Sequence, residues 1–145
     1  MDEAGTKPVM PAWYWAAAIG ALLFELLGCY FYFAEVTMSR AEIMSLPLDQ
    51  RQMLAARPSW YYAAFGVAVW VGLVGAGGLL WRKSWADRML LASLVAVVVQ
   101  FSAIFIVPEM RLVTSDALLG PVIIIIISYG IWQLSRLAKR RGWLR

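Results

Sequence analysis

The hydrophobic positions of this chain fall into four long runs. Trp60–Trp81, Met89–Val107 and Ala117–Gln133 contain no charged residue, and Trp13–Ala34 contains only Glu25. Because about 20 apolar residues in a helix cross a bilayer core, each run has close to the length of one transmembrane helix. The pattern therefore predicts membrane spans at about 12–34, 60–81, 87–107 and 118–137.

These runs predict an all-α fold, an integral membrane four-helix bundle that forms a single domain over residues 1–145. The turns that follow the second and third runs are short, which favours antiparallel packing of neighbouring helices. Composition agrees with this fold class, since 62% of the residues are hydrophobic and 15% are charged. Ordinary soluble domains contain about 25% charged residues.

The segment 35–59 between the first two runs carries signals for short helices. Ser39 and Glu42 have the spacing of a capping box, in which each side chain accepts a hydrogen bond from a free backbone N–H. Pro47 can begin a second helix, with Asp49 favoured in its first turn by the helix dipole. We expect either one or two amphipathic helices lying on the outer surface or a simple packed connector.

The net charge of +4 is unevenly distributed. Basic residues gather in the turn after the second run and in the C-terminal tail: Arg82, Lys83, Arg88, Arg136, Lys139, Arg140, Arg141 and Arg145. The positive-inside rule then places both termini in the cytoplasm and the 35–59 loop outside, in a bacterial inner (plasma) membrane. We interpret the basic tail as a topology signal that contacts membrane lipids, and we expect no nucleic-acid partner.

Small residues recur at every fourth position of the second run. Such stripes let helix backbones approach closely in a membrane. The predicted packing residues are Ala64, Ala68, Gly72 and Ala76 in the second run, with Gly20 and Gly28 as mates in the first. Contacts within one chain, in a homo-oligomer, or with other subunits of a membrane complex all remain open.

Several kinds of chemistry lack the residues they need. The chain has no His and a single cysteine, Cys29, so an intrachain disulfide, a zinc site or a bis-His haem site is excluded. Without His there is also no Ser–His or Cys–His nucleophile pair. We therefore expect no cofactor, no metal and no enzymatic activity.

Glu25 is the one ionisable carboxylate or amine near the middle of a predicted span. A charge at mid-bilayer costs about 2.5–3.5 kcal/mol on insertion scales, so an intramembrane acid indicates a functional site by default. A helical rise of about 1.5 Å per residue places polar or aromatic groups of the other spans at a similar depth. The candidate proton or substrate site is therefore Glu25, Gln100, Tyr129, Trp70 and Ser128, with Tyr32 on the same helix face as Glu25.

Three interpretations of Glu25 remain open. Desolvation favours the neutral form of a carboxyl, which can donate a hydrogen bond to Gln100 or Ser128 and accept one from Tyr129 in an interhelical clasp. Alternatively, the carboxyl exchanges protons or binds a cationic or hydroxyl-rich solute. In the third interpretation it pairs with a group on another subunit.

The chain resembles a group of small four-span bacterial inner-membrane proteins, some of which are called sugar transporters. The similarity covers most of the chain. It rests on Trp13-Tyr14-Trp15, Val36-Thr37-Met38-Ser39, Leu46-Pro47 with Gln50-Arg51, Pro58-Ser59-Trp60, Trp85-Ala86, Val99-Gln100 and Arg141-Gly142-Trp143-Leu144-Arg145. Over one helix, Phe24-Glu25-Leu26-Leu27-Gly28 is similar to the acid-bearing segment of the small multidrug resistance family, which implies a mechanistic analogy with an essential first-helix acid.

Two functional hypotheses follow. The first is a small-solute transporter, proton-coupled or sugar-like, that uses the Glu25 carboxyl. The second is a non-catalytic accessory subunit, or a lipid- or pigment-binding component, of a larger membrane complex. A transporter needs Glu25 in a water-accessible crevice with converging polar groups. An accessory subunit would bury Glu25 in a dry clasp and expose the Ala64–Ala76 stripe or aromatic side chains to a partner.

Overall fold

The computed structural model describes residues 9–112 and 115–145, without the side chains of residues 112–117. This part of the chain is helical and contains no strand. Its elements are α1 (Ala12–Val36), α2 (Arg40–Ser45), α3 (Leu48–Ala56), α4 (Ser59–Leu80), α5 (Ala86–Ile106), the 3₁₀ helix η1 (Pro108–Leu112) and α6 (Ser115–Arg140). Residues 1–8 of the predicted single domain lie outside the described part.

Within the described residues, four helices are long and apolar enough to cross a membrane: α1, α4, α5 and the Leu118–Arg140 part of α6. This confirms the predicted all-α, four-span class, and the spans coincide with the four hydrophobic runs. The predicted capping box is also present at the start of α2, where Ser39 and Glu42 bond to each other's backbone N–H. Hydrogen bonds from the Ser39 side chain and backbone lower the pKa of Glu42.

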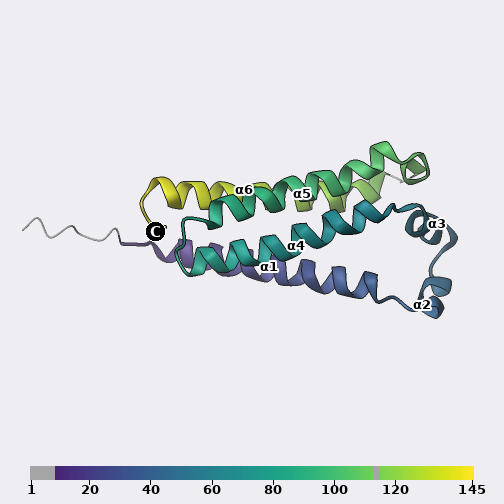
Figure 1. Cartoon of the computed structure of the whole chain (residues 1–145), viewed down its shortest axis with the longest axis horizontal. Coiled ribbons are helices and arrows are strands. Elements are labelled where there is room, and N and C mark those ends of the chain that lie inside the picture. The colour runs from purple at the N-terminus through teal and green to yellow at the C-terminus, as the bar shows by residue number, and fades with distance from the viewer. Residues whose placement is uncertain (1–8, 113–114) are drawn as a thin grey trace, which may run out of the picture.

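The helices pack in chain order, with α4 against both α1 and α5, and α6 against α5 (Figure 1). The start of α1, the α4–α5 turn and the C-terminus lie together at one end of the bundle, which we call the tail end (Figure 1). Helices α2, α3 and η1 lie at the opposite end, the loop end (Figure 1). Helices α2 and α3 contain no buried residue, so they extend the bundle at this end and are not part of its core.

The tail end is closed by aromatic packing and hydrogen bonds. The Tyr14 hydroxyl donates to the Leu79 carbonyl at 2.9 Å, near the C-terminus of α4. Trp143 packs edge-on against Trp13 and Tyr14, with ring centroids 5.8 and 5.6 Å apart. The Arg82 Nε donates to the Trp143 carbonyl at 3.0 Å. The C-terminal segment is thereby fixed across the ends of α1 and α4.

The small-residue stripe of α4 is used within the chain. Ala68, Gly72 and Ala76 are buried, and the Ser93 hydroxyl of α5 donates to the Ala68 carbonyl at 2.6 Å. Ala64 is half-buried. The close approach that small residues permit therefore joins α4 to its neighbours in the same protein.

The two predicted mates in α1 behave differently. A Cβ added at Gly28 would lie 3.1 Å from a methyl group of Val69, so Gly28 does pack against α4. Gly20 is exposed and has nothing within 4 Å of such a Cβ, so its predicted contact is not made within the described chain. The cause is rotation about the helix axis, because α1 turns Ala18 and Ala21 toward the core instead.

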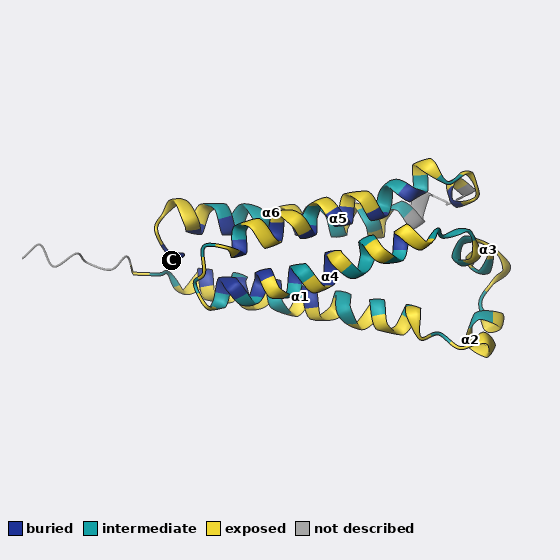
Figure 2. Ribbon diagram, in the orientation of Figure 1, coloured by how far each residue is buried: buried dark blue, intermediate teal, exposed yellow. Residues whose placement is uncertain are grey.

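Burial along α1 changes abruptly at its middle. Its buried residues are Tyr14, Ala18, Ala21 and Glu25, and the helix has none beyond Glu25. Figure 2 shows this change as dark blue in the tail-end half of α1 giving way to teal and yellow toward the loop end. The helix is thus held tightly over its first half and loosely over its second.

The tail-end hydrogen bond gives a direct stability test. Tyr14→Phe removes the side-chain donor of the Leu79 carbonyl, which keeps only its backbone donors such as the Arg82 N–H at 3.1 Å, and we expect a loss of about 1 kcal/mol in the free energy of unfolding. Thermal unfolding of the detergent-purified protein measures this loss as a lower Tm. Tyr30→Phe is the matched control, because Tyr30 lies exposed on the same helix. An equal Tm for the two variants would contradict the assigned bond.

Candidate intramembrane site

Glu25 lies at the contact between α1 and α4. The residue is only 5% exposed. A Cβ placed on Gly72 would overlap all three atoms of the Glu25 carboxyl group, so the missing side chain of Gly72 makes the space that the carboxyl occupies. The acid is therefore accommodated by a glycine of the small-residue stripe.

Among the described residues, Glu25 takes part in no side-chain hydrogen bond and no ion pair. The two ion pairs of this part of the chain lie at the bundle ends, Arg57–Glu35 at the loop end and Lys139–Asp87 at the tail end. The structure shows no hydrogen bond between Glu25 and the partners expected for the clasp, all of which it describes, and the Gln100 Nε2 donates to the Tyr61 hydroxyl at 3.2 Å. The carboxyl remains available to a ligand or a proton.

A cavity of about 340 Å³ lies beside this carboxyl, between the four long helices. Its walls are mostly apolar, with a few polar groups. They are formed by Phe24, Glu25, Leu27, Gly28, Phe31, Glu35, Tyr61, Phe65, Ala68, Val69, Val97, Gln100, Phe101, Ile124 and Ser128. Glu25, Gln100 and Ser128, three of the residues predicted from helical depth, thus line one cavity from three different helices.

The other predicted site residues lie elsewhere. Trp70 and Tyr129 are 46% and 50% exposed and are not among the residues that line this cavity. The Tyr129 hydroxyl accepts a hydrogen bond from Gln133 one turn along α6. Tyr32 is half-buried and packs edge-on against Phe65, at 5.2 Å between ring centroids, outside the cavity lining.

Sequence reasoning missed the aromatic part of the site. Tyr61, which fixes Gln100, and the side chains of Phe24, Phe31, Phe65 and Phe101 all line the cavity. In the sequence they are indistinguishable from lipid-facing or interfacial aromatics, because these occur at every rotational position of a membrane helix. The spacing of four between Tyr61 and Phe65, and of seven between Phe24 and Phe31, is the signal that places each pair on a common helix face.

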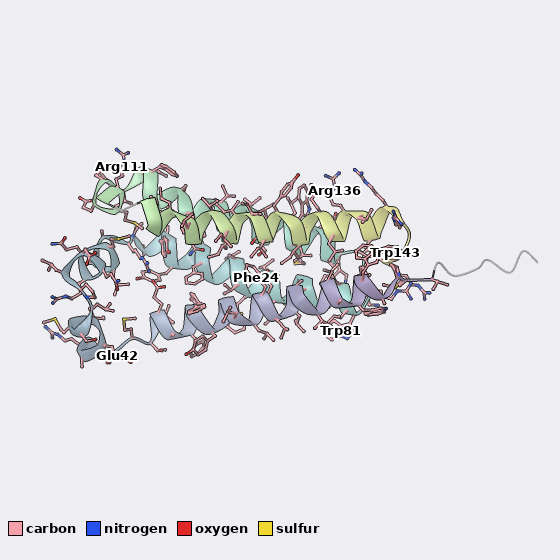
Figure 3. The ribbon with its side chains drawn as sticks, turned by 180° about the vertical axis from the view of Figure 1, so that it is seen from behind. Phe24, Glu42, Trp81, Arg111, Arg136 and Trp143 are labelled. Atoms are coloured by element: carbon pink, nitrogen blue, oxygen red, sulfur yellow. The ribbon has the colours of Figure 1, made fainter. Side chains whose placement is uncertain are left out.

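The cavity lies on the side of the bundle where α1 and α6 face each other. Figure 3 shows Phe24 between these two helices, which are nearest the viewer in that orientation. Leu27 and Phe31 are exposed and Ile124 is half-buried, and all three contribute to the lining. The wall between α1 and α6 is therefore the thin side of the cavity.

This arrangement limits the chemistry of the site. It combines two carboxyls, Glu25 and the ion-paired Glu35, with one amide, two hydroxyls and aromatic rings. The described residues contain no cluster of three metal-ligating side chains. A carboxyl without a protein partner can hold a proton or pair with a cation, and aromatic faces attract cations as well as apolar groups. Proton exchange and cation binding are thus the reactions available here.

Comparison of the chain with protein-family models, with curated proteins and with solved structures finds no match. The two family resemblances of the sequence therefore stay predictions.

The contact between Glu25 and Gly72 predicts a specific coupling. Replacing an exposed helical glycine by alanine stabilises a protein by about 0.4–1 kcal/mol where the conformation suits alanine. Gly20→Ala should show this gain, whereas Gly72→Ala should not, because its methyl group displaces the Glu25 carboxyl. In a Glu25→Ala background, Gly72→Ala should recover the gain.

Thermal unfolding of these variants in detergent forms a double-mutant cycle between positions 25 and 72. Gly20→Ala provides the matched control in the same α1–α4 pair of helices. Additive effects of Gly72→Ala and Glu25→Ala would show that the carboxyl does not pack on Gly72.

Proposed function

We propose that this protein is a small-solute transporter of the membrane, in which the Glu25 carboxyl is the site of proton or substrate binding. One observation carries the proposal: a buried carboxyl without a partner among the described residues borders a cavity of about 340 Å³. Intramembrane acids of this kind are costly to place, and they mark proton relays and solute paths. Convergence of Gln100 and Ser128 on the same cavity supports a binding role.

The orientation we propose follows from the basic residues. Arg82 and Lys83 lie in the α4–α5 turn, and Arg140, Arg141 and Arg145 lie at the end of the chain. The positive-inside rule assigns this tail end to the cytoplasm of a bacterial inner membrane. The loop end then faces outward. The cavity extends from Glu25 toward this loop end, since Glu35 and Tyr61 also contribute to the lining.

The lining favours a small apolar cation over a sugar. A sugar needs many hydrogen-bonding partners, and Gln100, Ser128 and Tyr61 are too few to surround one. Four phenylalanine rings and a single carboxyl without a partner, that of Glu25, instead match a cation with an apolar body. Binding of such a cation would displace the proton of Glu25, and transport of the cation would thereby be coupled to movement of a proton.

A lipid-binding role is the second candidate, supported by the thin wall between α1 and α6. Exposed Leu27 and Phe31 on this wall would admit an alkyl chain from the bilayer. The accessory-subunit hypothesis loses one of its supports, because the Ala68–Ala76 part of the stripe is buried within the chain instead of facing a partner.

Benzyltrimethylammonium is a suitable probe, because it combines one aromatic ring with a fixed positive charge. We expect it to bind the protein in lipid nanodiscs and to release protons on binding. Isothermal titration calorimetry measures the binding, and the dependence of the observed heat on the ionisation enthalpy of the buffer measures the proton release. Glu25→Gln removes the negative charge with little change in shape and should weaken binding at least tenfold. Proton-driven uptake of the probe into proteoliposomes should be abolished.

Glu109→Gln is the control for this test, since Glu109 is an exposed acid of η1 outside the cavity. It should bind and transport the probe as the unmodified protein does. Unchanged binding and uptake by Glu25→Gln would contradict the proposed function. Displacement of a bound fatty acid in place of cation binding would favour the lipid-binding role.

A further inference from the structure

A continuous series of side chains joins the loop-end surface to the cavity. Glu35 pairs with Arg57, Arg57 stacks on Tyr61, and Tyr61 accepts a hydrogen bond from Gln100. We propose that the Glu35–Arg57 ion pair is the gate through which a water-soluble ligand enters the cavity from the loop end. The inference rests on the proposed function, because a gate serves a site that ligands reach.

The ion pair lies where three spaces meet. Glu35 lines the intramembrane cavity and also two loop-end hollows, of about 480 and 410 Å³, that lie between the end of α1 and helices α2 and α3. Arg57 follows α3 directly and lines one of these hollows. The pair therefore forms part of the wall that separates the hollows from the cavity.

The same pair ties the loose half of α1 to the rest of the bundle. Glu35 is the penultimate residue of α1, and Arg57 lies in the linker just before α4. Because α1 has no buried residue beyond Glu25, its loop-end half depends on the contacts of Gly28 with Val69 and of Tyr32 with Phe65, and on this pair. Breaking the pair removes the tie nearest the end of α1, beyond the Tyr32–Phe65 contact, and lets that end move away.

Opening of the pair would also be felt inside the cavity. The Arg57 guanidinium lies 4.8 Å from the centre of the Tyr61 ring, and the Tyr61 hydroxyl holds Gln100 at 3.2 Å. Tyr61 and Gln100 both line the cavity. A movement of Arg57 is thus transmitted through one ring to a polar group that faces the ligand space.

The two ends of the bundle differ in how firmly they are closed. At the tail end, a buried cluster that includes Tyr14, Leu79 and Trp143 lies between the cavity and the surface. At the loop end, the Glu35 and Arg57 side chains are still 18% and 20% exposed. The atoms that meet, Glu35 Oε1 and Arg57 Nη1, are buried, but water beside the two side chains can solvate both charges once they separate, so this wall can open without unfolding the helices.

Accessibility of the cavity to a charged thiol reagent tests the gate. The protein carries Ser128→Cys in a Cys29→Ser background, which leaves one thiol, on the cavity wall. The full chain in nanodiscs is treated with 2-(trimethylammonium)ethyl methanethiosulfonate, whose fixed charge prevents entry through lipid. Modification should be slow with the ion pair intact and at least tenfold faster with Arg57→Gln or Glu35→Gln.

Two further variants make the result specific. Lys139→Gln breaks the tail-end ion pair with Asp87 and should leave the rate of modification unchanged. The exchanged pair, Glu35→Arg with Arg57→Glu, should restore slow modification, because it re-forms the attraction with the charges reversed. Circular dichroism of each variant confirms that the helices are retained. Glu35→Gln keeps Arg57 available to Tyr61 and so isolates the ion pair from the stacking contact.

Equal rates for the intact pair, Arg57→Gln and Glu35→Gln would overturn the gate. Such a result would leave the proposed function standing if benzyltrimethylammonium still bound in a Glu25-dependent way. Faster modification in both variants, together with no Glu25-dependent protection by benzyltrimethylammonium, would retain the gate and reject the proposed transport site. The two failures are therefore distinguishable in the same preparation.

Discussion

The packing of the Glu25 carboxyl on Gly72 is the contact on which the rest of the structure depends. It is the last buried contact of α1, and it ends the tightly packed half of the bundle. On its tail-end side, small residues such as Ala21 and Ala76 let the helices close completely. On its loop-end side, the same helices leave a cavity. A carboxyl in this place is costly in a bilayer, and its position at the boundary of the cavity is the reason to regard it as functional.

From this boundary follows the asymmetry between the two ends. The tail end is sealed by the C-terminal segment, which Arg82 and Tyr14 hold against the ends of the helices. The loop end is held by the Glu35–Arg57 pair and aromatic contacts around it. A bundle built in this way changes shape most easily at the loop end, while the tail end acts as a fixed base. Such an arrangement suits a site that is approached from one side.

How much of this was predictable differs between levels of structure. The four helices and the capping box follow from local patterns, and helical rise placed Glu25, Gln100 and Ser128 at a common depth. Depth does not fix rotation, however: each residue turns about 100° from the last, so Tyr129 points outward although Ser128 faces the cavity. The gate was not predictable for a related reason, since charges near the ends of membrane helices are usually solvated and only the folded loop brings Arg57 to Glu35.

Infrared spectroscopy of the Glu25 carboxyl in lipid tests the central claim most directly. In nanodiscs at neutral pH, the account predicts a band of a protonated carboxylic acid that Glu25→Gln removes and that benzyltrimethylammonium converts into a carboxylate band. That result would identify an exchangeable acid in the membrane. A band that belongs to Glu25 but is insensitive to the cation at every pH would instead identify a structural carboxyl and contradict the account.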